Sequence, residues 1–209
     1  EAAIQVQTGK GSFTLTPSVL ERIVAGKTVS VSIGEASDAA AASANEKMKG
    51  EGVQPLLVRP IEFSLWADGK EAAADTGVVY PARSIALPSG TIAEEATAVW
   101  IDSSGAPRFV PSVFATDGEA STATIYSPRG GLYAVIRSKK TFPDLQGHWA
   151  QAEAERMAGK RIVEGTTPTT FSPDADISRA EFAALLARSL GLAEAKPDAS
   201  PFDDVPAGA

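Results

Sequence analysis

The stretch that decides the fold is "DISRAEFAALLARSLGL", residues 176–192. Ser178 followed three residues later by Glu181 is the pattern of a capping box, and it predicts the start of a helix. Gly191 predicts the end of that helix. Four apolar residues recur on one helical face between these points: Phe182, Leu185, Leu186 and Leu190. Arg179 would take the first helical position, where the helix end already carries partial positive charge, so a cation there is locally unfavourable.

An anionic ligand would explain Arg179. A helix N-terminus offers backbone N–H donors and a positive potential, and a guanidinium adds a planar, bidentate group for a carboxylate. Ser178 and Glu181 would fix the helix end that aims this arginine. The residues alone leave a second interpretation open, in which Arg179 is solvated or pairs with Asp174 or Asp176.

The composition bounds the remaining possibilities. The chain has 209 residues, 44% hydrophobic and 22% charged, as in a globular protein of one large or two small domains. The net charge of −7 disfavours nucleic acid as a partner, and no apolar run reaches the roughly 20 residues of a membrane-spanning helix. The chain has no cysteine and a single histidine, His148. We therefore expect no metal, no cofactor and no enzyme activity.

Residues 1–140 carry the pattern of antiparallel β-strands. Alternation is clearest at 28–33 and 61–67, where apolar and polar residues fall on opposite faces. The other short β-rich runs are 4–7, 12–16, 96–102, 108–114, 122–127 and 131–137. Their spacing, with turns such as "ADGK" at 67–70, predicts a sandwich-like domain. One helix is expected from Pro17 to Gly26, and the Ala/Ser-rich stretch 35–52 is interpreted as an exposed loop, helical at most in part.

The pattern changes near residue 140, and helices should follow. The first would begin near Trp149, with a stripe of Trp149, Ala152 or Glu153, and Met157. "FPDLQGHWA" from Phe142 then recurs as "FDDVPAGA" from Phe202, an internal repeat that encloses one helix–loop–helix unit. We therefore expect an α+β chain: a β-rich domain over 1–140, one repeat over 141–193, and a linker with the start of a second repeat over 194–209.

Residues 141–192 resemble an S-layer homology (SLH) repeat. The resemblance rests on the Phe-x-Asp start, His148-Trp149-Ala150, "IVEG", "FSPDADI", the Ser-Arg-Ala-Glu signature and the "LGL" end. The preceding β-rich region, with "ATAVWIDSSGAPRFVPSVF" and "GLYAVI", is similar to the region often found before SLH repeats in Gram-positive (Paenibacillus- or Bacillus-like) surface proteins. The family usually has three repeats.

This resemblance implies non-covalent anchoring of a secreted protein to the cell wall, through an anionic, pyruvylated secondary cell-wall polysaccharide. The residues that match the family's ligand contacts are Arg179 and Trp149, supported by the helix cap of Ser178 and Glu181. The expected partners are the wall polysaccharide and further SLH repeats in cis, with neither nucleic acid nor membrane. Because a single repeat cannot cover its own apolar face, it should pack on the β-rich domain or promote a homo-oligomer.

Two alternatives remain open at this point. The β-rich domain would be a separate glycan- or protein-binding module if it formed a groove lined by aromatics such as Trp66 or Trp100. The chain would instead be an ancillary part of a surface polysaccharide-degrading enzyme if it held a cleft with paired carboxylates.

Overall fold

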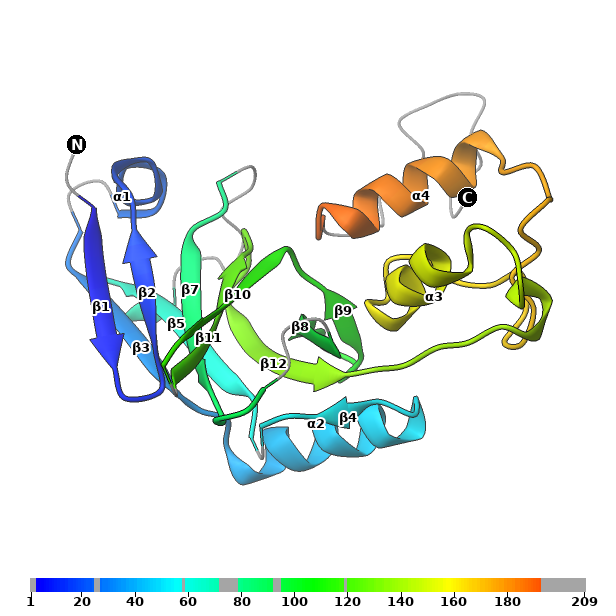
Figure 1. Ribbon diagram of the computed structural model, residues 1–209. Coiled ribbons are helices and arrows are strands. Elements are labelled where there is room, and N and C mark those ends of the chain that lie inside the picture. Colours follow the sequence, from blue (N-terminus) through cyan, green and yellow to red (C-terminus); the bar gives the residue numbers. More distant parts are fainter. Residues whose placement is uncertain are drawn as a thin grey trace.

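The computed structural model describes residues 3–24, 27–57, 59–71, 79–91, 95–118 and 120–192. It shows two antiparallel sheets packed face to face, with the helices α3 and α4 following at one end of the sandwich (Figure 1). The α+β class predicted from the sequence is confirmed. The predicted boundaries at 140 and 193 stay predictions, and the expected start of a second repeat lies outside the described residues.

The first sheet has the strand order β1-β2-β7-β11-β10. Its strands are β1 (Ile4–Thr8), β2 (Gly11–Leu15), β7 (Ala82–Leu87), β10 (Ser112–Asp117) and β11 (Ala120–Tyr126). The second sheet has the order β3-β5-β12-β8-β9, with β4 paired to β12 and β6 to β5. Its strands are β3 (Val29–Glu35), β4 (Gln54–Pro55), β5 (Ile61–Ala67), β6 (Lys70–Glu71), β8 (Ala96–Ile101), β9 (Pro107–Phe109) and β12 (Gly131–Arg137).

The sandwich core lies between the two sheets. Phe63 of β5 is at its centre, with edge-to-face contacts to Phe13 of β2 and Tyr133 of β12 at ring separations of 6.2 and 5.8 Å. The alternation predicted at 28–33 is present, since the valines and the isoleucine there are more buried than the serines. At 61–67 it holds for Ile61, Glu62 and Phe63, but Ser64 is buried while Leu65 is only partly buried. Burial of the facing sides of the two sheets is therefore a main source of stability for this part.

The stretch 108–114, expected to be one strand, is divided between the two sheets. β9 ends at Phe109 in the second sheet, and β10 begins at Ser112 in the first. Pro111 lies between them and has no N–H for a ladder hydrogen bond, which favours a break in pairing there. The strand β7 had no counterpart among the predicted runs.

The stretch 35–52 contains the helix expected in part of it, but it is not an exposed loop. Residues Asp38–Gly50 form helix α2, with Ser37 as its N-cap. Ala44 and Met48 are buried against the outer face of the second sheet, where they meet Val99 and Ile136. α2 lies along that face in Figure 1. Helix α1 (Pro17–Val24) begins at Pro17 as expected, while its predicted stop at Gly26 lies outside the described residues.

The C-terminal part consists of a short 3-10 turn, η2 (Pro143–Leu145), and the helices α3 (Gln151–Gly159) and α4 (Arg179–Ser189). Its small core contains Phe142, Leu145, Ala154 and Ala158, with Phe171 tilted against Phe142 at 5.3 Å. The predicted stripe of α3 is wrong. Its buried face carries alanines, whereas Met157 and the preceding Trp149 are exposed.

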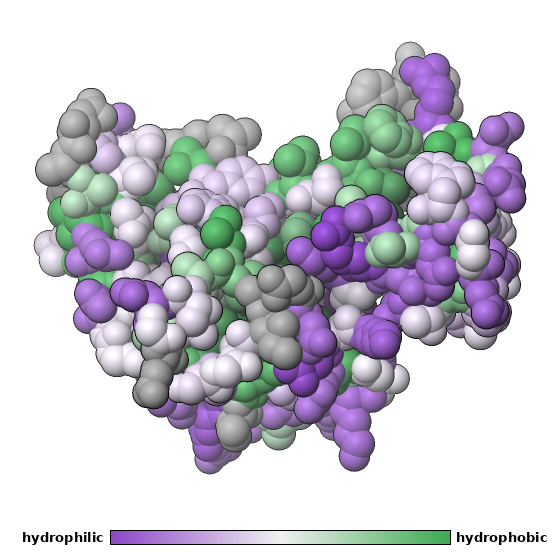
Figure 2. Space-filling model, viewed as in Figure 1, coloured by the Kyte–Doolittle hydropathy of each residue, from purple (hydrophilic) through white to green (hydrophobic). Residues whose placement is uncertain are grey.

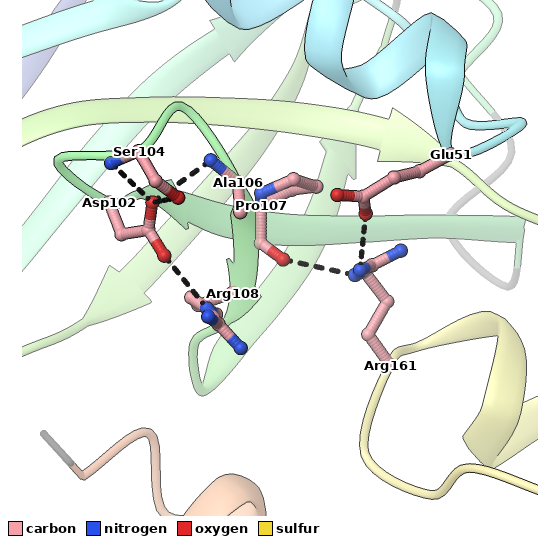
Figure 3. Close-up of polar contacts among 7 residues, drawn as sticks. All are labelled: Glu51, Asp102, Ser104, Ala106, Pro107, Arg108 and Arg161. Atoms are coloured by element: carbon pink, nitrogen blue, oxygen red, sulfur yellow. Dashed lines mark hydrogen bonds and ion pairs between the residues drawn. The ribbon is translucent and has the colours of Figure 1, made fainter.

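The C-terminal part contacts the sandwich at several points among the described residues. Arg161 donates from Nε to the carbonyl of Pro107 at 3.0 Å and pairs through Nη2 with Glu51 of the sandwich side at 2.5 Å (Figure 3). The Tyr80 hydroxyl donates to the carbonyl of Leu190 at 3.2 Å. A Cβ on Gly159 would lie 2.7 Å from the carbonyl oxygen of Ser138, so the two parts approach closely there. Within the described residues, no helix has the length and apolar character to cross a membrane.

Candidate functional site

The start of α4 has the capping box that the sequence predicts. Ser178 is the N-cap, and its hydroxyl oxygen accepts from the Glu181 N–H at 3.2 Å. The Glu181 carboxylate accepts in return from the N–H and the hydroxyl of Ser178, at 2.9 and 2.6 Å. The Ser178 hydroxyl and N–H hold the pKa of Glu181 below its ordinary value. These bonds fix the first turn of α4 and therefore the backbone position from which the Arg179 side chain extends.

Arg179 is the first residue of α4 and is exposed. Within the described part of the chain it has no ion-pair or hydrogen-bond partner for its side chain. Asp174, one of its two expected acidic neighbours, lies instead 3.5 Å from Nε2 of His148. A free guanidinium beside the N–H groups of a capped helix end is a suitable binding group for an anion.

Trp149 lies on the surface just before α3, with 90% of its surface exposed. Its ring is tilted against the His148 ring at 5.5 Å, and the Ala150 N–H donates to Nδ1 of His148 at 3.2 Å. Trp149 is therefore not part of the core and offers an apolar face to solvent. An exposed flat ring of this kind can stack against a sugar.

The structure does not join these residues into one closed pocket. Arg179 and Trp149 make no cation–π contact, and neither of them lines the cleft that the described residues form. No three histidine, aspartate or glutamate side chains among the described residues gather as a metal site requires. What the arrangement offers is two separate exposed groups, one for an anion and one for an apolar ring.

Asp144 is a key residue of this region that the sequence reasoning did not assign. Its carboxylate accepts from the N–H groups of Phe171 and Ser172, at 3.0 and 2.7 Å, and so ties η2 to the loop that leads into α4. Those two N–H donors hold the pKa of Asp144 below its ordinary value. The available signal was the recurrence of Asp144 as Asp204 in the internal repeat.

Acid should loosen this loop as Asp144 is protonated. Because the folded-state pKa of Asp144 is lowered, its stabilising effect is complete above the unfolded value of about 4 and is lost as the pH falls through the folded value. Asp144→Asn should therefore lower the melting temperature at pH 7 and reduce the acid dependence of stability below about pH 4. Thermal unfolding followed against pH measures both effects. Asp176→Asn, at an exposed aspartate of the same loop, serves as the control, and an equal response of the two variants would contradict the assignment.

Comparison with known protein families finds a match in this region. The model of the S-layer homology domain matches residues 141–183, a range that includes Asp144, Trp149 and the capped start of α4. The sequence motifs from the Phe-x-Asp start to the Ser-Arg-Ala-Glu signature lie in this segment, and the "LGL" end at 190–192 lies beyond it. No solved structure matches the chain.

Three curated relatives are similar to part of the chain. An amylopullulanase of Thermoanaerobacterium thermosulfurigenes is 34% identical over 92 residues, which are 44% of this chain and 5% of that protein. A cellulosome-anchoring protein of Acetivibrio thermocellus is 34% identical over 100 residues, 47% of this chain and 22% of that protein. An endo-1,4-beta-xylanase A of Thermoanaerobacterium saccharolyticum is 33% identical over 93 residues, 44% of this chain and 8% of that protein. The chain thus spans less than a quarter of the length of each of these relatives.

Proposed function

Because residues 141–183 form an S-layer homology domain, we propose that the chain anchors a secreted protein non-covalently to the cell wall. The ligand is an anionic secondary cell-wall polysaccharide, with pyruvyl ketals as the acidic groups. The cellulosome-anchoring protein among the relatives supports an anchoring role at the cell surface. The role proposed for this chain is binding, without a catalytic step of its own.

The observation that carries this proposal is the unpaired Arg179 at the capped start of α4. A carboxylate of the polymer would accept two parallel hydrogen bonds from its guanidinium and would also feel the positive end of the helix. Trp149 would add an apolar surface for a sugar ring. Both side chains are already exposed, so binding needs no opening of the fold.

Further repeats would complete the site. The apolar face of α4 is exposed, since Phe182, Leu186 and Leu190 keep between 45% and 54% of their surface accessible. Figure 2 shows hydrophobic residues gathered over this helix. An apolar face of this kind is the surface that a neighbouring repeat would cover. We propose further repeats in cis as its partner, with a second copy of the chain as the substitute that would give a homo-oligomer.

Arg179→Ala should weaken binding to the wall polymer while leaving the fold intact. Loss of a charge-assisted hydrogen bond costs about 1.5–3 kcal/mol, which is roughly a ten- to hundredfold fall in affinity. Arg179→Lys should recover part of the affinity, because an ammonium cannot make the bidentate contact. The measurement is co-sedimentation with purified wall polysaccharide, for this chain and for a protein with three complete repeats.

Two variants separate binding from stability. Ser178→Ala should lower the free energy of unfolding by about 1 kcal/mol through loss of the cap. Arg156→Ala, at an exposed arginine of α3 that pairs with Glu153, should bind as the unmodified protein does. Unchanged binding by Arg179→Ala would show that Arg179 is an ordinary surface residue and would overturn the proposed contact.

A further inference from the structure

A cleft of about 470 Å³ lies between the sandwich and α4. On the sandwich side it is bordered by β8, β9 and the hairpin that joins them, and on the other side by α4 and the segment after α3. The residues that matter for its chemistry are Trp100, Arg108, Phe109, Arg129, Arg161 and Arg188. Its size lies within the range of about 300–1,000 Å³ that is typical of small-molecule sites, and such sites favour the junction of two units.

Arginines from four separate segments meet at this cleft. Arg108 belongs to β9, Arg129 to the connection between β11 and β12, Arg161 to the segment after α3, and Arg188 to α4. The acidic residues in the lining are Asp102 and Glu164. The lining therefore carries four guanidinium groups and two carboxylates, which favours an anionic ligand.

The two carboxylates are engaged within the protein. Oδ1 of Asp102 accepts from the N–H and hydroxyl of Ser104 and from the Ala106 N–H, while Oδ2 accepts from Nε of Arg108 at 2.9 Å (Figure 3). Partial burial works to raise the pKa of Asp102, but the bonds from Ser104, Arg108 and Ala106 lower it to about 2. Glu164 is 3.8 Å from Arg188. Asp102 thus holds the hairpin and orients Arg108, which projects from β9 toward the side of α4 (Figure 3).

Arg129 brings to this cleft a guanidinium with one buried donor that has no acceptor among the described residues. It is 8% exposed, and its guanidinium lies over the Trp100 ring at 4.7 Å. Its Nη2 is buried with no hydrogen-bond acceptor, and within the described residues no carboxylate pairs with it. A buried donor without an acceptor is costly. A ligand carboxylate in the cleft would supply that acceptor after a small adjustment of the Arg129 side chain.

We propose that this cleft binds a carboxylate-bearing sugar unit, with its carboxylate between Arg129 and Arg188. The excess of arginines over carboxylates in the lining favours a ligand with a negatively charged group. The rings of Trp100 and Phe109 in the lining offer apolar surface to a sugar ring. Trp100 is held in place by a hydrogen bond from its indole N–H to the Gly130 carbonyl at 3.0 Å. A uronic acid combines both features and fits the volume of the cleft.

This site is distinct from the wall-polymer contact proposed at Arg179. Arg179 and Trp149 do not line the cleft, so the two proposals can fail separately. Arg179→Ala should leave binding in the cleft unchanged. Loss of binding in the cleft should likewise leave the Arg179 contact in place.

Calorimetric titration of the chain with D-glucuronate tests the proposal, with glucose and inorganic phosphate as parallel probes. Glucuronate should bind, glucose should not, and phosphate should bind at least about tenfold more weakly because it lacks the ring. Arg188→Gln, at an exposed position that does not threaten the fold, should weaken glucuronate binding about three- to tenfold. Arg129→Gln should weaken it by about tenfold or more, since the remaining buried amide cannot offer a charged fork.

Arg156→Gln, outside the cleft, is the matched control and should bind glucuronate as the unmodified chain does. Circular dichroism would show whether Arg129→Gln is folded, and Arg188→Gln decides the question if it is not. Absence of glucuronate binding would overturn the proposal, as would binding that Arg188→Gln leaves unchanged. Equal affinity for phosphate and glucuronate would overturn the assignment to a sugar acid.

Discussion

Replacing Phe142 with alanine is expected to destabilise the C-terminal part by about 3–5 kcal/mol, the usual cost of removing a buried aromatic ring. Phe142 is 2% exposed and forms the centre of a core of a few residues, where it packs against Phe171. Gly165 lies against the Phe142 ring and has no side chain that could occupy the cavity left by its removal. A Cβ at Gly165 would lie 2.4 Å from the Thr170 carbonyl oxygen, so the backbone there is closely packed. The cavity would therefore remain, and the loop that leads to α4 would lose its support.

The measurement is hydrogen exchange of the α3 and α4 backbone amides in increasing urea, which reports the unfolding of the C-terminal part, beside polymer co-sedimentation. Phe182→Ala provides a matched control, because Phe182 is 53% exposed on α4 and its loss should change the free energy of unfolding by about 0.5 kcal/mol or less. If Phe142→Ala cost no more than Phe182→Ala, the small core would not be what holds the repeat.

Replacing Met48 with alanine should destabilise the sandwich by about 2–5 kcal/mol. Met48 of α2 is fully buried against the outer face of the second sheet, beside Val99 and Ile136. Removal of the Met48 side chain would leave a cavity between α2 and the strands β8 and β12 that it covers. Thermal and urea unfolding of the whole chain measure it.

The chain offers its own control for this experiment, because it has two methionines. Met157 of α3 is 40% exposed, so Met157→Ala should have a small effect. Equal effects of the two substitutions would mean that the contact of α2 with the second sheet contributes little to the stability of the fold.

Met48 also shows why the sequence did not reveal α2. The buried residues of this helix are Ala41, Ala44 and Met48, and its other alanines are outside the core. Alanine fits both a buried and an exposed face, so the stretch has little hydrophobic contrast for a periodic pattern to detect. Its high helix propensity was the better signal, and the need to cover an apolar sheet face is known only once the sheet is built.

Rules that act over a few residues were reliable. Ser178 and Glu181 are three positions apart, and their capping box follows from local geometry. Most strands were recognised for the same reason, since alternation is a local property. The break at Pro111 was missed because the two halves of that run are sorted between sheets by tertiary packing.

The cleft could not be predicted in this way. Arg108, Arg129, Arg161 and Arg188 are far apart in the sequence, and no spacing rule connects them. Trp100 was singled out as a possible groove aromatic, but its stacking with Arg129 depends on the hairpin and on the connection before β12. Sequence patterns identify which residues are unusual, while the fold decides which of them meet.

The connection between the sandwich and the C-terminal part, which begins at the end of β12, has a mechanical consequence. The chain leaves the sandwich at Arg137, the end of β12, which is an inner strand of the second sheet. β12 is paired with β8 from Leu132 to Arg137 on one side, and with β5 and β4 on the other. A pull that arrives along β12 acts parallel to the strand, so the hydrogen bonds on both sides are strained together in shear. An edge strand pulled in the same direction would be held by hydrogen bonds on one side only. Tension that enters the sandwich at Arg137 is therefore shared by the hydrogen bonds to β8, β5 and β4.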